Sequence, residues 1–218
     1  MARFLTFPFF NHNSVTIMKL QTIIADRFQG RFRQSGFTLV ELLVVIAIAG
    51  VLVSLVQPRI RAIIIEGRVE STAKDIINAT NVLRASAAAN GTQTPYTTLG
   101  AGAVATASFA NAAMGKASNL SVAGVGAAAT VQHNLGATNS QVTVAQAANP
   151  TAGDSFAVTV PTANKAACPG LATQLSRVAE AITINAVQVK AVNGQYNGTA
   201  GENACTADDT NTFVFTFR

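Results

Sequence analysis

The stretch RQSGFTLVELLVVIAIAGVLVSLVQPR, residues 33–59, contains one long apolar segment that constrains every interpretation of the chain. Within residues 37–56 the only charged side chain is Glu41. Twenty helical residues extend ~30 Å at ~1.5 Å each, which is about the thickness of the hydrocarbon core of a bilayer. The segment is therefore predicted to span a membrane, although a carboxylate there costs roughly 2.5 kcal/mol or more to bury.

Two general interpretations leave part of this segment unexplained. A cleaved secretory signal would follow a basic region, which is present, and Ala47-Ile48-Ala49 matches the small-residue cleavage pattern. However, Glu41 interrupts the apolar region of such a signal, and the apolar run continues beyond Ala49. An ordinary transmembrane anchor explains the length but not Glu41, and basic residues on both sides leave its orientation open.

The six residues GFTLVE, at positions 36–41, resemble the processing site of type IV prepilins. The shared features are a glycine, a hydrophobic first mature residue and a glutamate at the fifth mature position. The resemblance implies that a prepilin peptidase cuts after Gly36 on the cytoplasmic side and methylates the new amino terminus of Phe37. It also implies that the apolar segment is kept, first as an anchor in the bacterial inner membrane and then in the core of a fibre.

The same resemblance assigns a role to Glu41. A carboxylate in an apolar environment needs a cationic partner. In the prepilin family that partner is the amino terminus of a neighbouring subunit, so Glu41 is expected to set the axial register of a helical homopolymer. The other partners implied are an inner-membrane assembly platform, its cytoplasmic ATPase and a secretin.

The basic character of the chain is concentrated in its first part. The net charge is +5, but residues 1–36 carry five basic and one acidic side chain, whereas residues 37–218 carry ten basic and nine acidic ones. The larger part therefore offers no basic patch for nucleic acid, and no nucleic-acid partner is expected. Residues 1–36 are interpreted as a leader that is removed, with Met18 as an alternative start.

A helical pattern continues beyond the apolar segment and predicts a spine over residues 37–90. One stripe at alternating spacings of four and three contains Val69, Ala73, Ile76, Thr80, Leu83 and Ala87. Charged residues off this stripe are Arg68, Glu70, Lys74, Asp75 and Arg84. Asn90-Gly91 is a stop signal. Pro58 removes a backbone donor; relatives suggest a kink or an extensible stretch there, and a simple bend at the bilayer surface is an alternative.

Residues 91–218 are predicted to form a globular head with a small antiparallel sheet. Strands are expected at 121–125, at 141–145, at 154–160 before Pro161, and at 213–217. A helix is expected from Cys168-Pro169 to Ile182, followed by a strand that includes Ile184, Val187 and Val189. Turns are expected at Asn193-Gly194 and Asn197-Gly198.

The two cysteines, Cys168 and Cys205, lie far beyond the apolar segment and are not spaced for zinc. Their position suggests export and a disulfide, with two separate buried thiols as the alternative. A helix between strands, tied by a cysteine loop and closed by a C-terminal strand, resembles the head of type IVb pilins, the toxin-coregulated and conjugative thin-pilus kind. The expected fold is thus an α+β pilin fold with a disulfide-closed region at 168–205.

These observations predict the structural subunit, or major pilin, of an extracellular type IV pilus. No catalytic arrangement, metal site or cofactor is expected, so the chain is predicted not to be an enzyme. One alternative is a minor pilin at the fibre tip that acts as an adhesin or a DNA-binding module. Another is a type II secretion pseudopilin. The sequence leaves open whether the fibre serves adhesion, mating, aggregation or motility.

Overall fold

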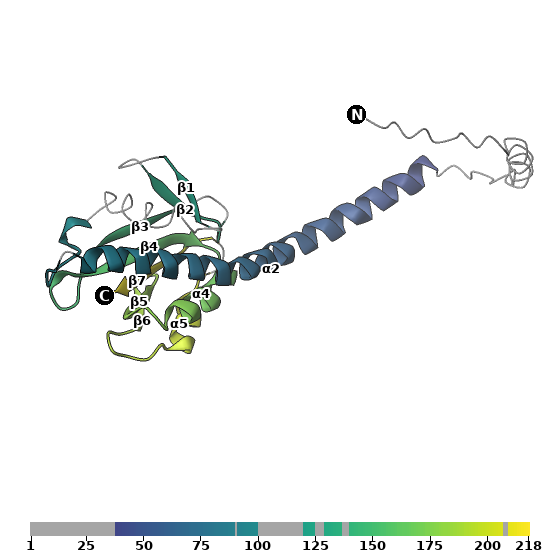
Figure 1. Ribbon diagram of the computed structural model, residues 1–218. Helices are drawn as coiled ribbons and strands as arrows, with labels where there is room; N and C mark the ends of the chain where they lie inside the picture. The colour runs from purple at the N-terminus through teal and green to yellow at the C-terminus, as the bar shows by residue number, and fades with distance from the viewer. Residues whose placement is uncertain (1–37, 90, 100–119, 125–128, 137–139, 207–208) are drawn as a thin grey trace, which may run out of the picture. The chain divides into compact units, whose positions relative to one another are not determined.

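A computed structural model describes residues 38–89, 91–99, 120–124, 129–136, 140–206 and 209–218. The expected leader, Gly36 and Phe37 lie outside these residues. The chain divides into two compact units, Met1–Gly50 and Val51–Arg218. The described part of the first unit is the beginning of a long helix. The second unit contains the rest of that helix together with a head made of one sheet and short helices (Figure 1).

Helix α2 extends from Leu39 to Ala88, a length of 50 residues, which confirms the expected long helix. The side chain of Thr38 caps its first turn, because Thr38 Oγ1 accepts a hydrogen bond from the backbone N–H of Glu41 at 3.2 Å. Pro58 lies inside the helix and does not end it. The absence of its N–H removes one helical hydrogen bond, but a kink at this position stays a prediction.

The second half of α2 buries one face against the head. All six residues of the predicted stripe, from Val69 to Ala87, are at most 5% exposed, which confirms the helical pattern. Asp75, which lies off the predicted stripe, is nevertheless only 7% exposed. Thr72 and Ala79, one turn before and after Asp75, are buried as well, so the buried face is wider than the stripe.

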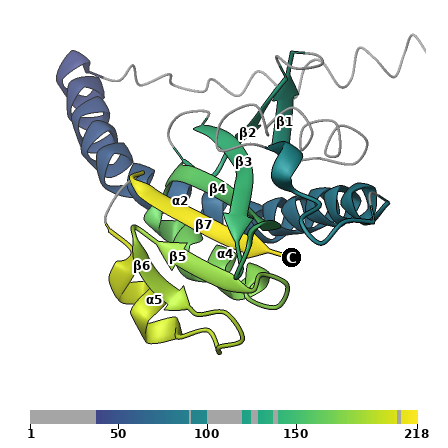
Figure 2. The ribbon, with the colours of Figure 1, turned by 90° about the vertical axis from the view of Figure 1, so that its left-hand side faces the viewer.

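Seven strands form one antiparallel sheet in the order β1-β2-β3-β4-β7-β5-β6. Their bounds are β1 (Leu120–Ala123), β2 (Thr130–His133), β3 (Ser140–Ala148), β4 (Ala152–Ala163), β5 (Ala181–Ile184), β6 (Val187–Lys190) and β7 (Asn211–Phe217). Strand β7 lies between β4 and β5, as Figure 2 shows. Three predicted strands, at 121–125, 141–145 and 213–217, correspond to β1, β3 and β7. The short, half-polar β2 was not predicted.

Strand β4 continues past the proline that was expected to end it. It reaches Ala163, with Pro161 inside. Its pairing with β3 ends at Thr159, and its register against β7 shifts between Val160 and Ala163. Pro161 therefore occupies an irregular part of the strand where a missing N–H costs no regular ladder bond.

The expected helix from Cys168 to Ile182 is shorter than predicted. Helix α4 spans Cys168–Leu175, and Ile182 belongs to β5. Lys190 fixes the end of this helix, because its Nζ donates hydrogen bonds to the carbonyls of Ser176 and Ala179, each at 2.6 Å. A cation at the C-terminal end of a helix also complements the helix dipole.

The single strand expected around Ile184, Val187 and Val189 is a hairpin, so that prediction was wrong. Strands β5 and β6 are joined by Asn185 and Ala186, which have φ values of 48° and 67°. Two consecutive positive φ values are typical of a type I′ hairpin turn. The turn expected at Asn197-Gly198 is instead the start of helix α5 (Gly198–Ala204), with Asn197 Oδ1 accepting from the N–H of Ala200 at 3.0 Å.

Aromatic residues of the central strands fill the core between the sheet and α2. Phe213, Phe215 and Phe217 alternate along β7 and are 0% exposed. Phe217 packs against Phe156 of β4 with ring centroids 5.5 Å apart. The guanidinium of Arg84 from α2 lies 5.6 Å from the centroid of the Phe217 ring, within the range of a cation–π contact.

His133 is buried at the end of β2, with 1% of its surface exposed. Its Nδ1 accepts a hydrogen bond from the N–H of Leu135 at 3.2 Å, which places the ring proton on Nε2. Nε2 donates to the carbonyl of Pro161 at 2.7 Å. Burial lowers the pKa of His133, and the hydrogen bond to Pro161 only partly opposes this effect.

Lowering the pH from about 7 to about 5 should therefore destabilise the head through His133. The unfolded chain takes up a proton near the ordinary pKa of 6.5, whereas the folded chain has a lower pKa and does not. Stability is consequently lost as the pH falls below 6.5. Thermal unfolding across this range measures the loss. His133→Gln removes the titrating group, and an unchanged pH slope in this variant would contradict the assignment.

Candidate assembly site and disulfide region

Glu41 lies in the first turn of α2, where its side chain is exposed. Its backbone N–H is bound by Thr38 Oγ1, and the next amide, that of Leu42, donates to the Thr38 carbonyl at 3.1 Å. The first turn of a helix carries a partial positive charge from its free N–H groups, which favours an acidic residue there. The fold thus places the carboxylate at an end of α2 where a cation can approach it.

The surface around Glu41 consists of exposed aliphatic side chains. The large apolar residues from Leu39 to Val56 are between 47% and 76% exposed. Moving one such side chain out of water contributes roughly 1.5–3 kcal/mol. Over the five turns of this segment the gain is large, so the surface requires a bilayer or other protein to cover it. The helix is long and apolar enough to cross a membrane.

Cys168 and Cys205 form a disulfide, as expected. The bridge joins the first residue of α4 to the residue that follows α5, and the two Cα atoms are 6.2 Å apart. Cys168 is fully buried. Pro169 occupies the first turn of α4, where its missing N–H needs no helical partner.

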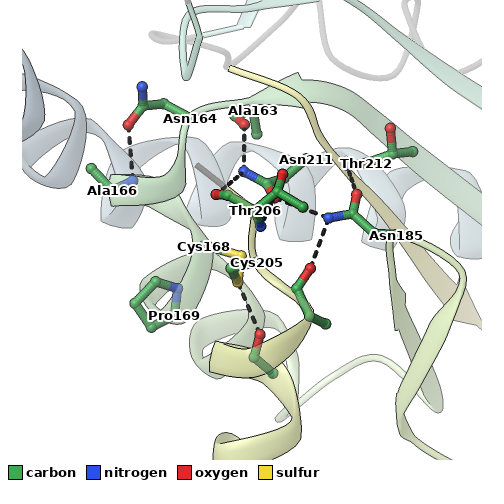
Figure 3. The surroundings of a disulfide bond; sticks show 12 residues. Ala163, Asn164, Ala166, Cys168, Pro169, Asn185, Cys205, Thr206, Asn211 and Thr212 are labelled. Atoms are coloured by element: carbon green, nitrogen blue, oxygen red, sulfur yellow. Dashed lines mark hydrogen bonds between the residues drawn. A yellow bond between two sulfur atoms is a disulfide. The ribbon is translucent and has the colours of Figure 1, made fainter. Parts of the chain in front are cut away.

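Two asparagines connect the disulfide to the sheet (Figure 3). Asn211, the first residue of β7, is fully buried. Its Oδ1 accepts from the N–H of Thr206 at 2.7 Å, and its Nδ2 donates to the carbonyl of Ala163 at 3.0 Å. Asn185, in the β5–β6 turn, donates through Nδ2 to the carbonyl of Ala204 at 2.8 Å. Asn185 Oδ1 accepts from the N–H of Thr212 at 2.8 Å.

Asp209 ties the disulfide region to α2. One carboxylate oxygen accepts from Arg61 of α2 at 2.8 Å, and the other accepts from Asn164 Nδ2 at 2.7 Å. Asn164 also caps the short helix η3 (Lys165–Ala167), because its Oδ1 accepts from the N–H of Ala166. The sequence alone did not indicate this contact. Its partners are 148 residues apart, so no local pattern indicates it.

Two family models match the chain. Residues 31–56 match the prokaryotic N-terminal methylation motif. Residues 103–218, more than half of the chain, match the PilS N-terminal family. No curated protein matches.

Among solved structures, a type IV b pilin from Salmonella typhi is 23% identical, with a TM-score of 0.44 over 65% of this chain and 98% of that one. TcpA, a type IV pilin from Vibrio cholerae El Tor biotype, is 18% identical, with a TM-score of 0.41 over 67% and 98%.

Cys168→Ser should destabilise the head by up to roughly 4 kcal/mol, because the bridge restricts a loop in the unfolded chain. The separation along the sequence is 37 residues. Cys205→Ser should cause a similar loss, and the double variant should lose little more, since both changes remove the same bond. Denaturant unfolding of the four proteins measures this cycle. Additive losses would show that each cysteine contributes by packing alone.

Proposed function

This chain belongs to the PilS family and is a type IV prepilin, and we propose that it is the major structural subunit of an extracellular type IV pilus of the IVb kind. As a pilin it is a structural subunit and not an enzyme, and it polymerises into a pilus after processing by a prepilin peptidase. The observation that carries the proposal is the overlap of the methylation motif, residues 31–56, with the exposed apolar half of α2.

Cleavage by the peptidase would create the cationic amine with which Glu41 is proposed to pair. Cleavage between Gly36 and Phe37 leaves a protonated amine at the head of α2, and methylation keeps its positive charge. In an apolar fibre core an unpaired carboxylate costs several kcal/mol. A subunit added at the correct axial position would neutralise its amine with the Glu41 carboxylate of a neighbour, and a subunit out of register would leave both charges unpaired.

The two halves of α2 would have different roles. The apolar half would anchor the precursor in the inner membrane and then pack among other copies in the fibre. The amphipathic half is already covered by its own head, so the head would be carried into the fibre as a folded unit. The assembly platform, its ATPase and the secretin would act on this unit. The Cys168–Cys205 bridge supports the IVb assignment.

Processing is tested by changing Gly36 to leucine. The bulky side chain should block the peptidase, so the precursor should stay unprocessed in the membrane. Gly50→Ala is the control, because a Cβ at Gly50 meets no atom within 4 Å. N-terminal sequencing of the assembled protein should give a methylated Phe37. A mature protein that begins at Gly50 would instead indicate a cleaved secretory signal.

Glu41→Ala should be processed and should stay in the membrane, yet its fibre yield should fall at least tenfold, because pairing of the new amine is worth several kcal/mol in an apolar core. Glu70→Ala is the matched control, since Glu70 is an exposed carboxylate of the same helix that pairs with Lys74. Quantification of sheared fibres from cells without the wild-type subunit measures the effect. Normal fibre yield with Glu41→Ala would rule out the register role.

A further inference from the structure

A groove of about 380 Å³ lies where α2 passes the loop after β2. Its residues are Gln57, Ile60, Arg61, Ile64, Ile65, Arg68, Asn134 and Gly136. On α2 the spacing of these residues places them along one side of the helix. Gln57 and Ile60 also line a second hollow with Leu52, Val53 and Val56. The apolar surface therefore continues from the predicted membrane span into the groove.

The polar groups of the groove are an arginine pair and an unused acceptor. Arg61 pairs with Asp209 through one nitrogen, which leaves other guanidinium donors available. Arg68 is exposed and forms no ion pair within the described part of the chain. The side-chain oxygen of Asn134 is buried and has no hydrogen-bond partner among the described residues. The groove thus presents guanidinium donors for an anion.

The position of Arg61 along α2 matches the depth of lipid headgroups. The predicted span ends at Val56, and Arg61 lies five residues later, a rise of ~7.5 Å along the helix. Headgroups extend roughly 5–8 Å beyond each side of the hydrocarbon core. Arg68 lies two turns further, ~18 Å along the helix from Val56, and its side chain points back toward the N-terminus, which brings its guanidinium nearer to the bilayer surface.

We propose that this groove binds an anionic phospholipid while the precursor is anchored in the membrane. One acyl chain would lie along Val56 and Ile60, and the phosphate would interact with Arg61 and Arg68. The proposal rests on the anchoring by residues 37–56 proposed above.

The charges favour a lipid over a second copy of the chain as the occupant. Between Glu41 and Glu66 the α2 sequence contains no acidic residue. The apolar half of a neighbouring α2 could therefore cover Ile60 and Ile64 but would bring no carboxylate to Arg68. An anionic phospholipid has an acyl chain that can lie along Ile60 and, next to it, a phosphate that can interact with Arg61 and Arg68.

The test is phospholipid retention by the full chain after extraction from nanodiscs of phosphatidylcholine with or without phosphatidylglycerol, counted by native mass spectrometry. Arg68→Gln should reduce retained phosphatidylglycerol about fivefold, equivalent to about 1 kcal/mol for one basic side chain near an anionic surface. Arg59→Gln is the matched control, because Arg59 is exposed on α2 outside the groove. It should retain the lipid as the wild type does.

A second pair of variants tests the apolar part. Ile64→Ser should reduce retention, whereas Ile63→Ser should not, since Ile63 is 67% exposed and does not line the groove. Equal losses of retained phosphatidylglycerol in all four variants would overturn the proposal. Retention of phosphatidylcholine equal to that of phosphatidylglycerol by the wild type would also overturn it. Unchanged retention with a reduced fibre yield would also overturn it and would assign the groove to a second copy.

A carbonate wash of the membranes separates this result from the proposed function. A chain that is washed out is not anchored, which would contradict both proposals. A chain that stays embedded but retains no phosphatidylglycerol would contradict the lipid site alone.

Discussion

The packing of α2 against the sheet is the interaction on which the head depends. One helix face supplies a large share of the core, and the sheet has no other long helix to cover that side (Figure 1), at least among the described residues. Small residues lie where α2 meets the head. Ala73 and Ala79 face the head, and a Cβ on Gly170 of α4 would lie only 3.1 Å from Val69 Cγ1. A larger residue at Gly170 would push α4 and its disulfide away from the helix.

The same helix that completes the head carries the apolar surface that we propose anchors the subunit and then packs in the fibre. Covering the first half requires a bilayer or neighbouring copies, whereas the second half is covered within the chain. Arg61, between the two, pairs with Asp209, which also accepts a hydrogen bond from Asn164, near the disulfide. The oxidised loop therefore acts on the orientation of α2 as well as on the stability of the sheet. The ion pair, the asparagine contacts and the disulfide therefore all stabilise the same part of the head.

Local patterns predicted the parts of this fold that local energetics control. The spacing of Val69, Ala73 and Ile76 indicated a buried helical face, and the alternation from Phe213 to Phe217 indicated a strand, since in both cases apolar burial follows the period of the backbone. The GFTLVE segment indicated the family by itself. Long-range contacts were not predictable in this way. Asp75 is buried because the head covers a wider face of α2, and Asp209 acquires its role from Arg61.

The errors between residues 160 and 205 have a related cause. Pro161 was expected to end a strand, but its neighbours in the sheet decide whether its missing N–H matters. Ile182 continued the apolar pattern of α4, yet Lys190 caps the carbonyls that end this helix from a different strand. Asn185 and Ala186 form the hairpin turn without a glycine, because contacts of Asn185 with Ala204 and Thr212 hold its positive φ. Of the candidate site, Glu41 and the cysteines were identified, whereas the two asparagines were not.

The central position of β7 has a consequence for export. Strands β4 and β5 both pair with β7 and not with each other. As the chain emerges from a translocation channel, residues 120–204 can form two partial sheets, but each keeps one exposed edge until residues 211–217 arrive. Open edges of this kind recruit strands from other chains. During the proposed export, the unfinished head would therefore be open to strand pairing with other chains until residues 211–217 arrive.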